Sequence, residues 1–249
     1  HEGGRVPADA LIRGADVAMY RAKDLGRDTA AFYEVGDQER VARSLEIERA
    51  LRAAIEDRQV DVHLQPIVEL VDGDLRGFEA LVRWHRPGAG PVPPIEMIRV
   101  AEESGLIVPL GRLVLEEACR RAAAWPTAPG RPPLDLSVNV SSRQLVHPSF
   151  VGQVAEVLER TGLAASRLCL EITETVLVDD LAVRGIAGLK ALGVRLAIDD
   201  FGTGHASFDY VRRLGGVDAI KIDRSFVAGI DDERGYDRAI VAAVLALGR

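Results

Sequence analysis

The chain has 249 residues, of which 47% are hydrophobic and 28% are charged, and its formal net charge is -7. This composition supplies a full hydrophobic core and excludes an intrinsically disordered chain. The negative charge argues against a protein that binds a DNA or RNA polymer, because such proteins normally carry a basic face. It does not exclude a nucleotide as a small-molecule substrate.

Cys119 and Cys169 are the two cysteines of the chain. They lie far apart and form neither a metal-binding motif nor a disulfide framework, so we expect buried thiols in a reducing compartment. No apolar run reaches the length of a transmembrane helix, and no signal peptide is present. The chain begins with His rather than Met. We therefore expect a cytoplasmic segment of a longer protein, with any membrane anchor in the regions that this chain lacks.

The first predicted elements are a helix, a short strand and a second helix. The helix over 7–25 has an apolar stripe of Leu11, Ala15, Ala18 and Ala22. Residues 29–35 predict the strand, and the charge-rich stretch 38–57 predicts the second helix.

From residue 60 onward, short apolar runs alternate with helical stretches. The predicted strands cover 60–70, 75–84, 134–140, 167–173, 194–199 and 217–223. The predicted helices between them cover 94–104, 110–125, 149–161 and 180–192, and a last helix begins at residue 236. This alternation predicts an α/β fold with a parallel sheet, either a closed (β/α)8 barrel or an open doubly wound sheet.

The polar residues near the strand ends favour the barrel. Glu79, Asn139, Glu171, Asp199 and Lys221 each lie in the C-terminal part of a different predicted strand. Functional residues drawn from many strand ends are typical of the C-terminal face of a TIM barrel, whereas an open sheet concentrates them at one switch point. The sequence contains neither of the glycine-rich phosphate-loop motifs. We predict a TIM-like (β/α)8 barrel of which about six strand-helix units are present.

The same residues form an oxygen-rich set. Carboxylates and an amide are ligands for Mg²⁺ or Mn²⁺ rather than for zinc. Asp200, directly after Asp199, could support a second ion, and two-metal sites are a recurrent device for phosphodiester hydrolysis. Lys221 would orient a water or neutralise phosphate charge, and Arg83 would hold a phosphate by a bidentate contact. Each residue alone has a simpler interpretation, such as a turn at Asp199 and Asp200, and only their joint placement favours a site.

Six motifs follow one another in the order found in the EAL domain family. They are FEALVRW (78–84), LQPIVEL, SVNVSSRQL, LEITET, AIDDFGTG and IKIDRSFV, and the resemblance spans roughly residues 40–249. The resemblance implies a metal-dependent phosphodiesterase that hydrolyses cyclic di-GMP to linear pGpG. Two alternatives stay open: a sensor that binds cyclic di-GMP without cleaving it, and an unrelated metal-dependent barrel enzyme of the enolase-like lyase type.

The resemblance also implies roles for single residues. The ligands of a two-metal site would be Glu79, Asn139, Glu171, Asp199 and Asp200, with Asp199 bridging the two ions. The catalytic set would be Lys221, Glu79 and Asp199, and Lys221 would position the attacking water. The loop after Asp200 would be supported by Glu174, Gly202, Thr203 and Gly204. The dinucleotide would be contacted by Gln65, Leu81 and Arg83.

Some features depart from the family pattern. Leu64 and His205 stand where the family often has aromatic residues, and a further glutamate and a glutamine of the last two βα units are expected but absent. We predict three parts: residues 1–36 resemble the end of a GGDEF (diguanylate cyclase) domain, 37–58 form a connecting helix, and 59–249 form the EAL domain without its last two βα units. We expect this chain alone to be inactive, and a homodimer stays an alternative to a monomer.

Overall fold

The computed structural model describes residues 15, 19, 37–127, 129–174, 180–202, 217–230 and 235–247. It divides into two compact units, His1–Ala54 and Ile55–Arg249. Of the helix predicted over 7–25, positions 15 and 19 are described, and both are helical. The strand predicted over 29–35 lies outside the described residues. Helix α2 (Asp37–Glu56) corresponds to the charge-rich helix predicted over 38–57.

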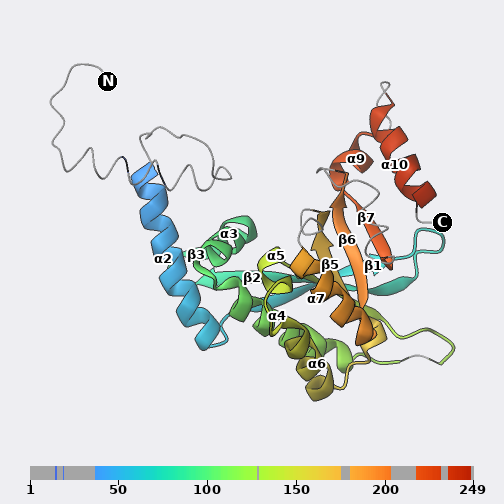
Figure 1. Ribbon diagram of the computed structural model, residues 1–249, viewed down its shortest axis with the longest axis horizontal. Coiled ribbons are helices and arrows are strands. Elements are labelled where there is room, and N and C mark those ends of the chain that lie inside the picture. Colours follow the sequence, from blue (N-terminus) through green and yellow to red (C-terminus); the bar gives the residue numbers. More distant parts are fainter. Residues whose placement is uncertain are drawn as a thin grey trace. The chain divides into compact units, whose positions relative to one another are not determined.

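The second unit is built on a mostly parallel sheet (Figure 1). Its strands are β1 (Asp61–Val68), β2 (Leu75–Arg86), β3 (Gly90–Val92), β4 (Asp135–Val140), β5 (Leu168–Thr173), β6 (Arg195–Phe201) and β7 (Ala219–Ile222). The strand order is β1-β2-β4-β5-β6-β7, with β3 paired to β2. The pairs from β2 through β4, β5 and β6 to β7 are all parallel, which confirms the predicted α/β class.

Helices connect these strands at the predicted places. The described ones are α3 (Pro94–Ser104), α4 (Ile107–Ala123), α5 (Ser142–Leu145), α6 (Phe150–Thr161), the short 3-10 helix η1 (Ala165–Arg167), α7 (Asp180–Ala191), α9 (Arg224–Ala228) and α10 (Tyr236–Leu247). Gly105 and Gly162 end α3 and α6 in the left-handed conformation that a helix terminus favours. Among the described helices, none combines the length and the apolar character needed to span a membrane.

The first two strands form a hairpin rather than a strand-helix unit. β1 and β2 are antiparallel, with Gln65 opposite Glu79. The turn is closed by a hydrogen bond of 2.8 Å from Glu69 N to Asp74 O, and Gly73 takes φ +73°. A parallel crossover needs a dozen or more residues, and the short connection from Val68 to Leu75 cannot supply them. No helix was predicted between these two strands, but their antiparallel pairing departs from the parallel sheet that the alternation predicted.

The sheet has an apolar face and a polar face. Alternate residues of the central strands are at most 3% exposed: Leu136, Val138, Leu168, Leu170, Ile172, Leu196 and Ile198. Helices α4 and α7 contact β4 and β6 and cover this apolar face. Because successive side chains of a strand point to opposite faces, the intervening polar residues project to the other side. The candidate site lies on that polar side.

Both cysteines are buried and free, as predicted. Burial raises the pKa of the Cys119 thiol to about 12 and that of the Cys169 thiol to about 11. Thiols with such pKa values are almost entirely protonated at neutral pH, so they are poor nucleophiles and poor metal ligands.

Candidate metal centre and active site

The parallel register aligns the predicted ligands of β2, β4 and β5. Glu79 of β2 lies beside Ser137 of β4, and Asn139, two residues further along β4, lies beside Glu171 of β5. Residues two apart in a strand share a face. Glu79, Asn139 and Glu171 therefore project from the same face of three adjacent strands.

The register continues this alignment into β6 and β7. Glu171 lies beside Ala197 of β6, and Ala197 lies beside Ala219 of β7. Asp199 and Lys221 each follow two residues later. The residues predicted from five separate strands are thus brought to one place, as the barrel interpretation requires.

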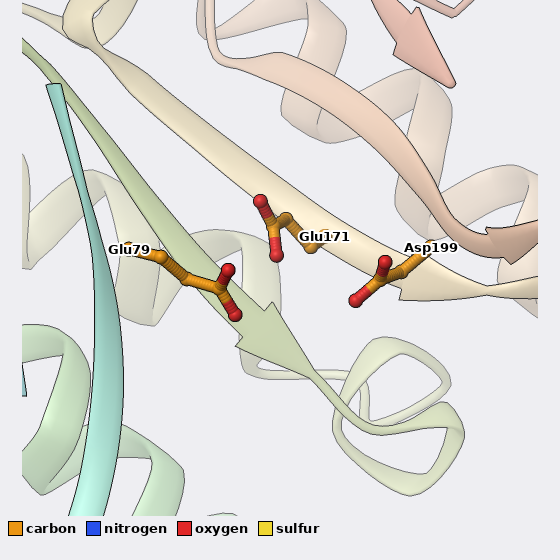
Figure 2. Close-up of side chains that lie close together, drawn as sticks. All are labelled: Glu79, Glu171 and Asp199. Carbon is orange, nitrogen blue, oxygen red and sulfur yellow. The ribbon is translucent and has the colours of Figure 1, made fainter. Parts of the chain in front are cut away.

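Three carboxylates converge at this place. Glu79, Glu171 and Asp199 each offer an oxygen, and these oxygens lie within 4.8 Å of one another. Figure 2 shows the three side chains reaching from three strands toward a common space. The Glu171 side chain is 2% exposed, against 17% for Glu79 and 19% for Asp199. Three negative groups so close together in a partly dry site need a cation to offset their repulsion.

Lys221 supplies positive charge to this cluster. Its Nζ donates to Glu171 Oε2 at 2.6 Å, to Asp199 Oδ2 at 3.1 Å and to Glu79 Oε2 at 3.2 Å. Asn139 Nδ2 donates to Glu79 Oε1 at 2.8 Å. One ammonium thus faces three carboxylates, so the group keeps an excess of negative charge.

The pKa values follow from this arrangement. Burial raises the pKa of Glu171, and the hydrogen bond from Lys221 offsets the rise only in part. Burial acts to lower the pKa of Lys221, but its hydrogen bond to Glu171 and the charges of Glu171, Glu79 and Asp199 raise it overall. Lys221 therefore stays protonated at neutral pH.

The adjacent acids Asp199 and Asp200 occupy a β-bulge. The pairing of Ile198 with Ile220 shifts before Phe201 pairs with Ile222, so β6 carries one extra residue there. Asp200 takes φ +53°, and its backbone N–H donates to Asp199 Oδ1 at 3.0 Å. Burial and the charge of Asp199 raise the pKa of Asp200. The bulge therefore places both acids in an irregular part of β6.

Gly202, which follows Phe201 after the bulge, lies between Glu174 and the Phe226 ring. Glu174 Oε2 accepts a hydrogen bond of 3.1 Å from the backbone N–H of Gly202. Gly202 has φ +99°, and a Cβ atom there would lie 3.1 Å from the Phe226 ring of α9. Asp223 caps that helix by accepting from Ser225 N. Thr203, Gly204 and His205 lie outside the described residues.

The predicted substrate-contacting residues share the polar face. Gln65 is the antiparallel partner of Glu79, and Leu81 and Arg83 follow Glu79 at alternate positions of β2. Leu81 and Arg83 line a cavity of about 480 Å³ together with Asn139 and Glu171. Gln65 is exposed and is not among the lining residues.

Sequence reasoning missed two supports of the site. Ser137, two residues before Asn139 on β4, is near enough to Glu171 to act against the rise of its pKa, and this spacing was the available signal. Directly after β4, Ser141 and Gln144 form a reciprocal capping box that starts helix α5. The Ser-x-x-Gln spacing is the known signal for such a box.

Comparisons with known proteins agree with this geometry. The EAL domain family model matches residues 48–249. A protein of Caulobacter vibrioides named an uncharacterized signaling protein is 47% identical over 246 residues, which is 97% of this chain and 29% of that protein. The cyclic di-GMP phosphodiesterase PdeR of Escherichia coli is 39% identical over 243 residues, 96% of this chain and 36% of PdeR. This chain thus spans about a third of these relatives' length.

A solved structure shows the same fold. The PaMucR phosphodiesterase in its c-di-GMP complex, from the Pseudomonas aeruginosa protein MucR, superimposes with a TM-score of 0.74 at 39% identity and covers 82% of each chain. Solved EAL domains have a TIM-like barrel, so the predicted fold is confirmed. The family model covers most of the chain and both relatives exceed 30% identity, so this chain belongs to the EAL domain family.

Proposed function

We propose that this chain provides the hydrolase site of a cyclic di-GMP phosphodiesterase that produces linear pGpG. The observation that carries the proposal is the convergence of Glu79, Glu171 and Asp199 around Lys221. The choice of substrate is supported by PdeR, which is named a cyclic di-GMP phosphodiesterase, and by the PaMucR phosphodiesterase, which was solved as a c-di-GMP complex. Because the chain spans about a third of its curated relatives, the activity of the whole protein is part of this proposal.

The donor set fits Mg²⁺ or Mn²⁺. Carboxylate and amide oxygens are the hard ligands that these ions prefer, and the excess negative charge around Lys221 favours a further cation. We propose that the first ion is held by Glu79, Asn139, Glu171 and Asp199, and that Asp199 and Asp200 contribute to the second. The Nδ2 atom of Asn139 is engaged with Glu79, which leaves its Oδ1 as the ligand atom. When bound, such ions lower the pKa of water and neutralise a phosphodiester.

The chain's own residues then position the reactants. Lys221 stays charged, and its three N–H donors engage the three carboxylates. We propose that Lys221 turns one of these donors to the attacking water, next to the phosphate, when a bound cation compensates the carboxylates. Arg83 can grip a phosphate oxygen pair, and Leu81 offers an apolar contact to the dinucleotide. Glu174 holds Gly202, and through it the orientation of the bulge that carries Asp199. Gln65, next to Glu79 on the neighbouring strand, is proposed as a further substrate contact.

The remaining predictions from the sequence are proposals of the same kind. We propose a cytoplasmic location, because the ligand is a nucleotide and the two thiols are free. The GGDEF-like segment 1–36, the connecting helix 37–58, the homodimer and any membrane attachment outside this chain stay predictions. The ligand is expected to be a cyclic dinucleotide rather than a DNA or RNA polymer.

The experiment uses the natural full-length protein with cyclic di-GMP and Mg²⁺ or Mn²⁺, and separates pGpG by chromatography. We expect pGpG from the wild type and a loss of about 100-fold or more in Glu79→Gln, because that change removes a preorganised charged group. Glu159→Gln, an exposed glutamate of α6, is the control and should keep full activity. Tight binding of cyclic di-GMP without formation of pGpG would identify a sensor instead. If the protein showed no binding and no turnover, the proposal would be overturned.

A further inference from the structure

The short helix α5 follows the strand that carries Asn139 after a single residue, Ser141. The capping box joins both ends of this turn. Ser141 Oγ accepts a hydrogen bond of 3.3 Å from the backbone N–H of Gln144, and Gln144 Oε1 accepts one of 3.2 Å from the backbone N–H of Ser141. Gln144 is 5% exposed, so its amide lies in the interior. A helix of one turn is not stable by itself, so its place depends on what packs against it.

Two glycines on neighbouring helices leave the space that α5 occupies. On α4, a Cβ atom at Gly111 would overlap the amide nitrogen of Gln144 and lie 2.9 Å from its Oε1. On α7, a Cβ atom at Gly185 would lie 2.7 Å from the backbone oxygen of Leu145, which is 2% exposed. Both separations are shorter than van der Waals contact allows. Helix α5 is therefore packed tightly between α4 and α7 (Figure 1).

The end of β4 depends on this packing. The pairing of β4 with β5 continues through Asn139 to Val140, whereas the pairing with β2 ends one residue before Asn139, at Val138. On the β2 side, the Asn139 side chain is held by its hydrogen bond of 2.8 Å to Glu79. The next fixed point of the backbone is Ser141, in the capping box. A movement of α5 would therefore be passed to Asn139 over two residues.

We propose that Gln144 and Gly111 are positioning residues for Asn139. The capping box fixes the backbone two residues after Asn139, and the close approach of Gly111 fixes the Gln144 amide that forms the box. Asn139 then presents its Oδ1 to the ion while its Nδ2 stays bonded to Glu79. Groups that orient a metal ligand in this way contribute to metal affinity without touching the ion. The inference rests on the proposed function, because it takes Asn139 as a ligand.

The test measures the Mn²⁺ affinity of the metal-free full-length protein by electron paramagnetic resonance. Gln144→Met keeps the side-chain volume but removes the acceptor for Ser141 N, and Gly111→Ala pushes the Gln144 amide out of the capping box. Each change should weaken Mn²⁺ binding about tenfold, the lower end of the effect of groups that orient a metal ligand. Gly188→Ala on α7 is the matched control, because its Cβ atom would press on Val151 of α6 at 3.0 Å, away from α5. Its Mn²⁺ affinity should stay within about twofold of wild type.

Coupling to Asn139 separates positioning from a general loss of stability. Asn139→Ala keeps the three carboxylates, so it should still bind Mn²⁺, more weakly than the wild type. In this background, Gln144→Met should change the affinity by less than about twofold, because the ligand that it positions is already gone. A further loss of about tenfold there would overturn the inference, and so would wild-type affinity in both Gln144→Met and Gly111→Ala. Absence of saturable Mn²⁺ binding in the wild type would overturn the proposed metal site itself, and the inference with it.

Discussion

Two groups of charged side chains in this molecule have the same design with opposite signs. In the candidate site, one ammonium, that of Lys221, faces three carboxylates. On helix α4, one carboxylate, that of Glu116, faces Arg58, Arg112 and Arg160 at 3.1 to 3.2 Å. Each group holds one charge against three of the other sign, so each has an excess.

The difference lies in where the excess charge is placed. The three arginines are 40–61% exposed, and Arg112 and Arg160 also reach Glu156, so water and a second acid absorb their charge. The three carboxylates of the site are 2–19% exposed and stand on short side chains fixed by strands. Such charges cannot move apart. The arginine group is therefore a surface ion-pair network, whereas the buried carboxylates of the site need a further cation to compensate their charge.

The largest effect is expected from Glu171→Gln, which changes the most buried member of the site. Metal-dependent turnover should fall about 10²–10³-fold, the range seen when one preorganised electrostatic group is lost. The measurement is the rate of pGpG formation at saturating Mn²⁺. The matched change in the surface network is Glu156→Gln, and it should leave the rate within twofold of wild type. Equal losses in both variants would erase the distinction between the two groups.

The next effect is expected from Lys221→Met in metal-free protein. Removing the ammonium leaves three close carboxylates without compensation, so the free energy of unfolding should fall by about 2–3 kcal/mol. Added Mn²⁺ should then raise the melting temperature more in this variant than in the wild type. Arg160→Met is the matched control, because Glu116 keeps two other arginines, and it should cost under about 1 kcal/mol. A Lys221→Met protein as stable as the wild type would contradict the account.

A smaller effect is expected from Gly202→Ala, which tests the support of the bulge. The positive φ opposes a side chain, and so does the Phe226 ring, which would lie 3.1 Å from the alanine Cβ atom. Stability should therefore fall by about 1–2 kcal/mol, and Mn²⁺ affinity should fall with it. Gly152→Ala on α6 meets no atom within 4 Å and should be neutral or stabilising. Denaturant unfolding and Mn²⁺ titration of both variants give the comparison. An unchanged Mn²⁺ affinity in Gly202→Ala would refute the positioning role.

The smallest effect concerns the pH dependence of the surface network. Burial raises the pKa of Glu116, but the hydrogen bonds from Arg112 and Arg58 outweigh it, so the pKa is lowered from its ordinary value of 4.5. A lowered acid pKa stabilises the fold above the ordinary value, and this contribution is lost as the pH falls through the folded-state pKa. Glu116→Gln should therefore cost about 1 kcal/mol at pH 7 and progressively less below pH 4.5. A cost that stays constant from pH 7 to pH 3 would argue against the ion pairs.

Much of the fold could be predicted because its signals are local. The helix expected over 94–104 is α3 at the same residues, and the strand expected over 167–173 differs from β5 by one residue. These elements are bounded by Pro, Gly or polar residues, and their apolar periodicity is regular. The antiparallel pairing of β1 and β2 was not predicted although Asp72 and Gly73 are a turn signal, because the strand-helix alternation of the rest of the chain predicted a parallel sheet.

The sequence predicted which residues form the site, but it did not predict their detailed arrangement. Strand ends in a parallel sheet meet at one edge, so the convergence of Glu79, Glu171 and Asp199 follows from the pattern. The bulge at Asp200 does not, because a two-residue acid pair reads equally well as a turn. The close approach of the Phe226 ring to Gly202 depends on the tertiary packing of α9, which no local sequence pattern predicts.

The central claim is that Glu79, Glu171 and Asp199 form a site for a divalent cation. The most direct measurement is a titration of metal-free protein with Mn²⁺, in which free Mn²⁺ is followed by electron paramagnetic resonance. We predict saturable binding in the wild type that is weakened about tenfold or more in Glu171→Gln and unchanged in Glu156→Gln. Absence of saturable binding, or equal binding in the wild type and Glu171→Gln, would contradict the account.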